Sequence, residues 1–573
     1  MDYISYPCRQ TRHDTRTVKI GDISIGGKHP VVIQSMLTSA TNDVDACLKE
    51  IQSLMAVNCQ LIRLTVPSMK DLEYVVKLRQ LLKIEGITVP LVADVHFSPN
   101  IAVAACEFFE KVRINPGNYT DVSKNARRNK SASWFEEGRE KLNQAIVPLV
   151  RQLKYYDRAL RIGVNHGSLS TRMIEQYGDS PKGMVESALE MINLFESQGF
   201  DQLVVSLKSS NPIVVQKAYR LLVEKSPEKN AVPLHLGVTE AGSGVEGRVK
   251  GLAGIGSLLM DGIGDTIRVS LTEESKYEII FAEKLLTSIE NRRNPDHFIG
   301  EDWKRELSHQ RIKNQSIIVG ELEIGNTSPL KLGVFESFPS KFKNFANEFD
   351  FKFKTGEDQD IWIDDKRLLI LPDNFEFGRY NENKSDGLIL SGSLNQLYHL
   401  RSEYKKLVSG KPIGMFYPIS QSEAETLYLE TQISAILSEG LLDFLLIPDN
   451  ISQKKLERAF YLLQATRSKM FFPDYIACPS CGRTLFDLQS ATAKIKKATG
   501  HLKGVKIGIM GCIVNGPGEM ADADFGYVGS GKGKIDLYLG QDKVKKNVDE
   551  NEAVDELVNL IKENNRWVEE PRE

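Results

Sequence analysis

The sequence predicts an α/β protein whose N-terminal region is a TIM (β/α)8 barrel. Eight short runs rich in β-branched residues end in polar or charged side chains, and helical patterns such as residues 43–55 and 184–198 lie between several of them. Alternating strands and helices predict parallel strands joined by right-handed crossovers. Eight units in about 270 residues match a TIM barrel, whereas an open doubly wound sheet, the alternative, usually needs fewer. The eight runs are residues 31–36, 60–66, 89–95, 111–115, 160–165, 202–208, 232–238 and 265–271.

Two further domains are predicted after the barrel. A polar, helix-breaking stretch at residues 291–296 ends a barrel domain of residues 1–290. Residues 291–470 are predicted to form an inserted α/β domain, and residues 471–573 an α+β domain. Strand-like runs in the insert are residues 316–319, 368–371, 387–390, 413–416 and 444–447, with a helix at 422–437. The last domain is predicted to have strands at 505–510 and 534–539 and a helix at 553–562.

The composition is that of an ordinary globular protein and argues against several classes of function. At 573 residues the chain is too long for one hydrophobic core, and a net charge of −3 gives no reason to expect a nucleic-acid partner. The first residues have no apolar core of the signal-peptide type, and no apolar run approaches the roughly 18 residues of a membrane span. Seven cysteines, an odd and sparse set, indicate a reducing compartment, so we expect a cytoplasmic protein.

Five cations follow or end the predicted barrel strands, at the end of a TIM barrel where active sites lie. They are Arg63, Arg113, Arg161, Lys208 and Arg268. Guanidinium forks bind phosphate oxygens in pairs, so five converging cations predict a polyanion such as a diphosphate. The alternative is that some of them pair with barrel carboxylates such as Asp94, Asp265 or Glu240.

Other polar residues share these strand ends but carry weaker signals. They are His96, Asn115, Asn165, His235, Glu240 and Ser270. A single histidine is more often a hydrogen-bonded core residue than a ligand. Glu240 is either a proton donor beside the cations or a helix cap.

The last domain contains three cysteines with the spacing of a metal or cluster site. Cys478 and Cys481 form a CxxC pair, and Cys512 lies within Gly511–Glu519, a segment rich in glycine. An iron–sulfur cluster usually takes four thiolates, so a cluster with three leaves one iron open to a weaker ligand or a substrate. Structural zinc, with His501 or a glutamate as fourth ligand, and a redox dithiol remain alternatives.

These motifs together resemble 4-hydroxy-3-methylbut-2-enyl diphosphate synthase of the non-mevalonate isoprenoid pathway. The resemblance covers roughly two thirds of the chain, and the combination of motifs is specific. In the barrel it rests on residues 34–36, 93–97, 113–118, 161–165, 235–242 and 264–270. In the last domain it rests on residues 478–482 and 511–519.

The resemblance implies an iron–sulfur oxidoreductase. A 4Fe–4S cluster would be held by Cys478, Cys481, Cys512 and, at rest, Glu519. The substrate implied is 2-C-methyl-D-erythritol 2,4-cyclodiphosphate, which two electrons from ferredoxin or flavodoxin convert to 4-hydroxy-3-methylbut-2-enyl diphosphate by ring opening and dehydration. The substrate would be bound by the five cations, with further hydrogen bonds from His96, Asn115, Asn165, His235 and Ser270. Glu519 would be a labile ligand, and Glu240 is our candidate acid for the departing hydroxyl.

The insert departs from the short bacterial form of this family and resembles a longer, three-domain form. There the insert is a spacer that is itself barrel-like, whereas the sequence alone supports only an α/β domain. The short form is a homodimer that closes between subunits, and an insert would let one chain close on its own barrel. Two alternatives remain: a TIM-barrel synthase for a phosphorylated substrate with a structural zinc domain, and a non-enzymatic electron carrier.

Overall fold

A computed structural model describes most of the chain and divides it into two compact units. The main unit contains His13–Ile255, Ile263–Glu283 and Phe472–Glu573, and the insert unit contains Met1–Arg12, Gly256–Gly262 and Lys284–Phe471. The residues described are 3–5, 12–120, 134–291, 305–307, 315–326, 328–336, 345, 347–356, 360–371, 385–391, 396–397, 400–401, 410–479, 481–513 and 516–569.

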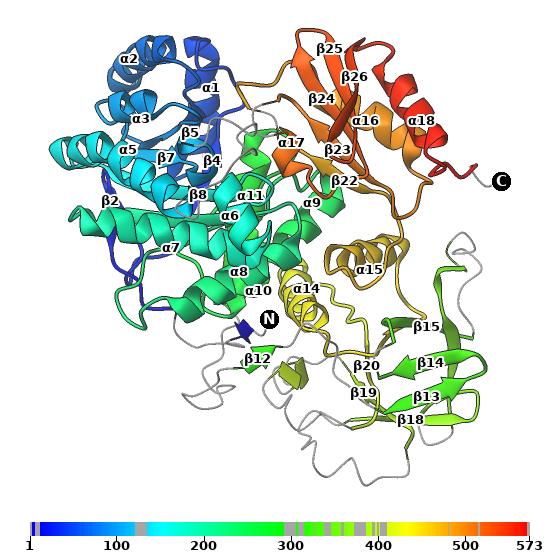
Figure 1. The fold of residues 1–573 in the computed structure, drawn as a ribbon. Coiled ribbons are helices and arrows are strands. Elements are labelled where there is room, and N and C mark those ends of the chain that lie inside the picture. Colours follow the sequence, from blue (N-terminus) through cyan, green and yellow to red (C-terminus); the bar gives the residue numbers. More distant parts are fainter. Residues whose placement is uncertain are drawn as a thin grey trace. The chain divides into compact units, whose positions relative to one another are not determined.

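The main unit begins with an eight-stranded parallel barrel (Figure 1). Its strands are β4 (Val32–Met36), β5 (Leu61–Thr65), β6 (Leu91–Asp94), β7 (Lys111–Ile114), β8 (Ala159–Asn165), β9 (Leu203–Lys208), β10 (His235–Leu236) and β11 (Thr266–Ile267). Their order is β10-β11-β4-β5-β6-β7-β8-β9, and a parallel bridge between Val205 and Leu234 joins the two ends of the sheet. All eight predicted strands and the TIM-barrel class are confirmed.

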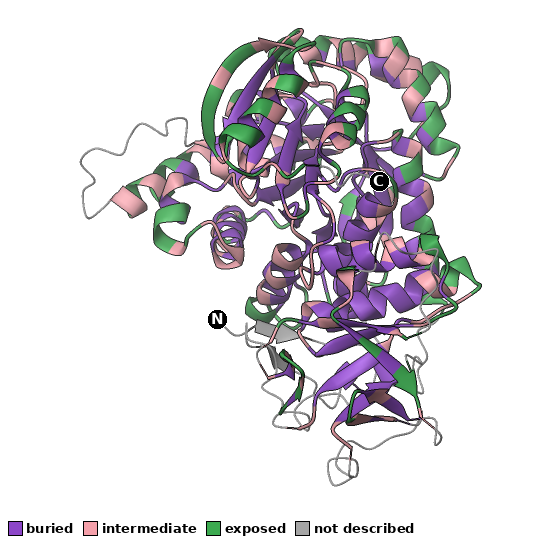
Figure 2. Ribbon diagram, turned by 90° about the vertical axis from the view of Figure 1, so that its right-hand side faces the viewer, coloured by how far each residue is buried: buried purple, intermediate pink, exposed green. Residues whose placement is uncertain are grey.

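Helices surround this barrel and bury one face each against it. They are α1 (Val44–Met55), α2 (Met69–Ile84), α3 (Pro99–Ala105), α4 (Pro116–Tyr119), α5 (Trp134–Tyr156), α6 (Thr171–Tyr177), α7 (Pro181–Ser197), α8 (Pro212–Lys225), α9 (Gly244–Gly251) and α11 (Ser275–Glu290). Their starts follow local chemistry: Asp43 accepts from the Ala46 amide at α1, and proline occupies the first turn of α3, α7 and α8. Figure 2 shows the buried strands inside and the exposed outer faces of the helices.

A hairpin closes the N-terminal end of the barrel. It is formed by β2 (Val18–Ile20) and β3 (Ile23–Ile25). Its apolar side chains pack against residues near the strand starts, including Val32, Leu61 and Ala159. Because this end is filled with apolar side chains, a polar site is left to the C-terminal end.

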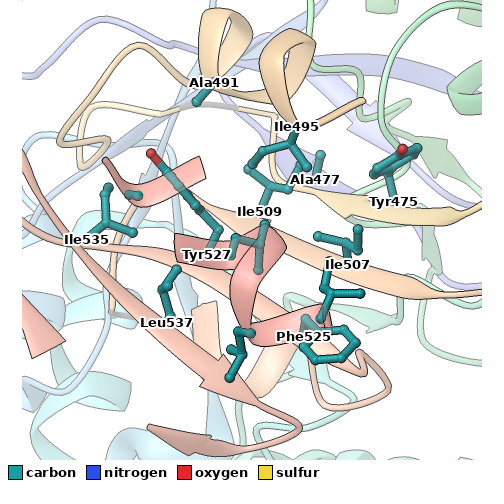
Figure 3. Packing of buried hydrophobic residues seen from close by; sticks show 14 of the residues in the cluster. Tyr475, Ala477, Ala491, Ile495, Ile507, Ile509, Phe525, Tyr527, Ile535 and Leu537 are labelled. Atoms are coloured by element: carbon teal, nitrogen blue, oxygen red, sulfur yellow. The ribbon is translucent and has the colours of Figure 1, made fainter. Parts of the chain in front are cut away.

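The C-terminal part of the main unit is a five-stranded sheet of order β22-β23-β24-β25-β26. Its strands are β22 (Asp474–Ala477), β23 (Lys506–Met510), β24 (Phe525–Gly531), β25 (Lys534–Leu539) and β26 (Asp542–Asp549). Two helices, α16 (Leu488–Thr499) and α18 (Ala553–Glu563), pack on one face, where they enclose the apolar core of Figure 3. The predicted strands and terminal helix of this α+β domain are confirmed.

The insert unit contains a closed seven-stranded barrel. Its strands are β15 (Lys331–Phe335), β16 (Phe351–Thr355), β17 (Ile361–Ile363), β18 (Lys366–Ile370), β19 (Gly387–Leu390), β20 (Ile413–Phe416) and β21 (Phe444–Ile447). Its other described elements include the hairpin β13 (Ser316–Val319) and β14 (Leu322–Gly325), the strand pair β1 (Tyr3–Ser5) and β12 (Arg305–Leu307), and the helices α10 (Ser257–Met260), α14 (Glu423–Ser438) and α15 (Gln453–Ala465). The expectation of a barrel-like α/β insert is confirmed.

Two further observations bear on cellular setting. Across the described residues, no helix combines the length and apolarity needed to cross a membrane. The six cysteines in that part of the chain form no disulfide; three are buried, and the other three are Cys478, Cys481 and Cys512.

Candidate active site

One cavity of the main unit lies at the C-terminal ends of the barrel strands. Its volume is about 90 Å³, several times the space that one water molecule needs. The barrel contributes Met36, Arg63, Asp94, Arg113, Arg161, Asn165, Lys208, Thr239, Glu240, Arg268 and Ser270. The C-terminal part contributes Cys478, Pro479, Cys481, Arg483, Met510, Gly511, Cys512, Gly516 and Glu519. The structure thus brings the predicted cations and the predicted thiols to one place.

All five predicted cations line this cavity, and only two of them have an acidic partner in the described part of the chain. Arg113 pairs with Asp94 at 3.1 Å, and Arg268 pairs with Glu278 at 3.2 Å. The other three, Arg63, Arg161 and Lys208, form no ion pair among the described residues. Buried cations without counter-charges favour an anionic ligand.

Arg113 is held in a fixed orientation toward the cavity. Besides Asp94, its guanidinium donates to the Gly163 carbonyl at 3.1 Å and to Asn165 Oδ1 at 3.3 Å. A Cβ atom on Gly163 would lie 2.2 Å from Arg113 Nε, so only glycine leaves room for the guanidinium. The conformation of Arg113 is therefore set before any ligand binds.

Lys208 ends β9 and is 5% exposed. Burial, followed by the charges of Arg63 and Arg161, lowers its pKa well below the ordinary value for lysine. An anion in the cavity would favour the charged form of Lys208 and so raise this pKa again.

Neither of the two predicted histidines lines the cavity; each contacts the guanidinium group of one of the cations. His96 Nε2 lies 2.5 Å from Arg113 Nη1, and His235 Nδ1 lies 2.7 Å from Arg161 Nη1. Burial, followed by Arg113, lowers the pKa of His96 to about 3, and burial also lowers the pKa of His235. Neutral rings can accept hydrogen bonds from the guanidinium groups, so both histidines orient a cation. Their direct contact with a substrate stays a prediction.

Asn115 is also outside the cavity lining. It is buried, and its side chain accepts from the Gly117 amide at 3.0 Å, which caps α4. Asn165 and Ser270, by contrast, line the cavity as predicted for ligand-contacting residues. Contact of these three side chains with a substrate likewise stays a prediction.

The thiols stand on two neighbouring loops of the C-terminal sheet. Cys478 directly follows β22, and Cys512 lies two residues after β23. The Gly511 amide donates to Cys478 Sγ at 3.2 Å, and the Cys481 amide donates to Thr484 Oγ1 at 3.0 Å. Gly511 thus brings a backbone N–H to sulfur.

Gly518 allows the C-terminal part of the site to pack closely against the barrel. A Cβ atom on Gly518 would lie 2.5 Å from Ser168 Oγ, and one on Gly167 would lie 1.8 Å from the Gly518 carbonyl oxygen. Beside this contact, Asn165 Nδ2 donates to Glu519 Oε1 at 2.9 Å. Within one chain, therefore, a barrel strand end holds the carboxylate predicted as fourth cluster ligand.

Glu240 faces the same carboxylate from the barrel. It is 3% exposed, and its φ of +50° is rare for a residue other than glycine. Burial, followed by the charge and hydrogen bond of Glu519, raises the pKa of Glu240 well above the ordinary value. This shift favours the protonated form of Glu240, which is the form that a general acid requires.

Two cationic residues near the site are absent from our sequence-based prediction. Arg483 lines the cavity and donates to the Asp94 carbonyl at 3.0 Å. Lys111 is fully buried, and its Nζ has no hydrogen-bond partner among the described residues. Arg483 lies two residues after the CxxC motif, and Lys111 lies two residues before Arg113 on the same face of β7, so both positions carried a usable signal.

Both parts of the main unit match models of known protein families. The model of the GcpE TIM-barrel domain matches residues 15–283, and that of the GcpE protein C-terminal domain matches residues 474–563. A protein of Leptospira interrogans named 4-hydroxy-3-methylbut-2-en-1-yl diphosphate synthase (flavodoxin) is 39% identical over 99% of this chain and 98% of its own length. The chain belongs to the GcpE family.

The insert of this GcpE-family chain lies within the part of the chain that its full-length relatives match. Proteins of the same name from Akkermansia muciniphila and Protochlamydia amoebophila are 40% and 36% identical. The first match covers 99% of both chains, and the second covers 97% of both. Such coverage includes the segment between the two matched domains.

Proposed function

We propose that this GcpE-family protein converts 2-C-methyl-D-erythritol 2,4-cyclodiphosphate to 4-hydroxy-3-methylbut-2-enyl diphosphate. In this reaction a ring C–O bond to phosphate breaks and a hydroxyl group leaves as water. Two electrons and two protons are added to the substrate, which balances the reaction. The observation that carries the proposal is a single cavity with five cations on one side and three thiols with a glutamate on the other. The names of its full-length relatives support the same reaction.

We assign a 4Fe–4S cluster to Cys478, Cys481, Cys512 and Glu519. Three thiols and a carboxylate line one cavity, and an N–H group donates a hydrogen bond to one of the sulfur atoms, as suits an iron–sulfur ligand set. Within the described residues, no three His, Cys, Asp or Glu side chains converge closely enough to hold a single metal ion. When bound, such a cluster supplies electrons to the substrate.

We also propose that the chain is divided into three domains, residues 1–290, 291–470 and 471–573.

The remaining residues bind and orient the substrate. Arg63, Arg113, Arg161, Lys208 and Arg268 hold the diphosphate, and Asn165 and Ser270 add hydrogen bonds. His96 and His235 keep Arg113 and Arg161 in place, and Asn115 shapes the loop after β7. Glu240 gives its proton to the departing hydroxyl.

Flavodoxin is the electron donor that the relatives' names support, and ferredoxin is the other candidate. We infer a cytoplasmic setting because the cysteines are few and odd in number, and those of the described residues form no disulfide. No nucleic-acid or membrane partner is proposed. Sedimentation would test whether the protein is a homodimer, and mixing of the Arg113→Ala and Cys512→Ser variants would test whether the site closes between subunits.

Metal analysis and turnover test the proposed function directly. Protein purified without oxygen should contain iron and sulfide in equal amounts, about four of each per chain, and should consume the cyclodiphosphate when a reduced flavodoxin is supplied. Zinc without sulfide would refute the assignment and favour the synthase alternative. Iron without turnover would leave an electron carrier.

Substrate binding should be accompanied by proton uptake. The pKa of Lys208 is lowered in the free protein, and a bound diphosphate raises it. At a pH between the Lys208 pKa of the free protein and that of the complex, the complex holds more protons than the free protein. Affinity for the diphosphate should therefore fall as the pH rises through this range. Calorimetric titrations in two buffers of different ionisation enthalpy measure the uptake, which Lys208→Met should reduce. Heats that do not depend on the buffer would contradict the prediction.

A further inference from the structure

A buried group of charges joins the barrel to the first strand of the C-terminal sheet. Lys250, on α9, places Nζ 3.0 Å from Glu246 Oε1, 2.9 Å from Asp474 Oδ1 and 2.9 Å from the Tyr475 carbonyl oxygen. The side chains of Lys250, Glu246 and Asp474 are 4%, 5% and 0% exposed. Glu246 and the Tyr475 carbonyl thus accept hydrogen bonds from the ammonium, and Asp474 forms an ion pair with it.

A second lysine completes this group. Lys496, on α16, lies 2.9 Å from the other oxygen of Glu246 and 5.0 Å from the centre of the Tyr475 ring. Two cations and two carboxylates make the group neutral. Displacing any member would leave a charge unpaired in a buried place, so the group favours one arrangement of α9, β22 and α16.

The same strand leads directly to a thiol. Asp474 and Tyr475 open β22, and Ala477 ends it immediately before Cys478. Four residues of strand span about 13 Å, so the buried charges and the thiol stand at opposite ends of one extended segment. Ala477 forms a parallel bridge with Ala241, the residue after Glu240. Fixing β22 therefore fixes Cys478 relative to Glu240.

The neighbouring strand depends on the same anchor. β22 pairs with β23 in register from Asp474 to Ala477. Beyond the paired residues, the Cys478 amide donates to the Ile509 carbonyl at 3.1 Å, and the Gly511 amide donates to Cys478 Sγ at 3.2 Å. A shift of β22 would thus also disturb the loop that carries Cys512.

We propose that Lys250 is a positioning residue, which clamps the start of β22 and thereby sets the thiol loops opposite Glu240 and the barrel cations. Lys250 does not line the cavity, so it acts through Cys478 rather than on the substrate. The proposal rests on the function proposed above for the consequence it predicts in turnover. Its structural part, the hold on β22, can be measured independently.

Lys250→Met removes the ammonium and keeps a side chain of similar length. Because misplacement of a catalytic group by about 1 Å costs roughly 100-fold, we expect kcat to fall by roughly 10- to 100-fold. The KM for the cyclodiphosphate should stay within roughly threefold, because the barrel cations are unchanged. Iron and sulfide content should be retained, and amide hydrogen exchange of residues 474–478 should accelerate.

Two sets of variants separate positioning from general damage. Arg248→Met removes a cation from the same helix, but Arg248 pairs with the half-buried Glu273 and does not reach the C-terminal sheet. It should leave kcat and exchange at β22 unchanged. Asp474→Asn and the Lys250→Met/Asp474→Asn pair complete a double-mutant cycle in which the losses should not add.

Unchanged kcat and unchanged exchange at β22 in Lys250→Met would overturn the proposal, as would additive losses in the cycle. Faster exchange with normal kcat would overturn the catalytic part. If Lys250→Met does not fold, kcat and amide exchange at β22 can be compared between Asp474→Asn and the wild type instead. Should the wild-type protein fail to turn over the cyclodiphosphate, the proposed function fails, and exchange at β22 still decides whether Lys250 holds the strand.

Discussion

Replacing Cys512 with serine should abolish conversion of the cyclodiphosphate and remove most of the iron. Among the described residues, three thiols line the cavity, so the loss of one leaves too few ligands for a stable cluster. We expect kcat to fall by roughly 1,000-fold or more, at least about 4 kcal/mol of activation free energy. Iron and sulfide analysis and the flavodoxin-coupled assay measure the two effects.

Cys106→Ser is the matched control for the loss of a thiol. Cys106 is buried in the barrel domain, where its thiol contacts the Ala102 carbonyl oxygen at 3.4 Å, and it does not line the cavity. This variant should keep its iron and most of its activity. Full activity in Cys512→Ser, or equal iron loss in the two variants, would contradict the ligand assignment.

Mixing two inactive variants tests whether one chain builds the whole site. Arg113→Ala should be inactive with its cluster intact, because Arg113 belongs to the barrel side. Asn165 contacts Glu519 of the same chain, so a mixture of Arg113→Ala and Cys512→Ser should stay inactive. Recovery of activity on mixing would instead indicate closure between the subunits of a homodimer.

The barrel was predictable because each strand carries its own signal. A β-branched run that ends in a charged residue is readable locally, and eight such runs define the fold. The insert was harder because its regular βα alternation is broken: β16, β17 and β18 pair antiparallel around short turns. The sequence of β16, Phe-Lys-Phe-Lys-Thr, alternates with period two, but such short strands do not reveal closure into a barrel.

The candidate site was predictable where chemistry is concentrated in motifs. Cysteine spacing and strand-end cations named the three thiols that line the cavity and every cationic residue of its lining except Arg483. What sequence reasoning missed depends on contacts between distant segments. The separation between Lys250 and Tyr475 is 225 residues, and neither segment alone shows that the two meet. Likewise, the packing of Gly518 against Gly167 follows only from how the two halves approach.

Replacing Glu240 with glutamine should lower kcat by roughly 100- to 10,000-fold, the usual contribution of a general acid. Glutamine keeps the shape of the side chain but has no proton to give to a leaving hydroxyl. Because the five cations and the thiols are untouched, the KM and the iron content should change little. Glu273→Gln, which alters a carboxylate outside the cavity, should behave like wild type.

The outcome separates proton donation from a purely structural role of Glu240. A glutamine amide can still donate a hydrogen bond to Glu519, so a structural role would survive the change. Glu240→Asp keeps the acidic proton but is one methylene shorter, and it should recover part of the activity that glutamine loses. Equal losses in both variants would indicate that position matters rather than the proton. Full kcat in Glu240→Gln with an intact cluster would mean that the proton comes from another group facing the cavity.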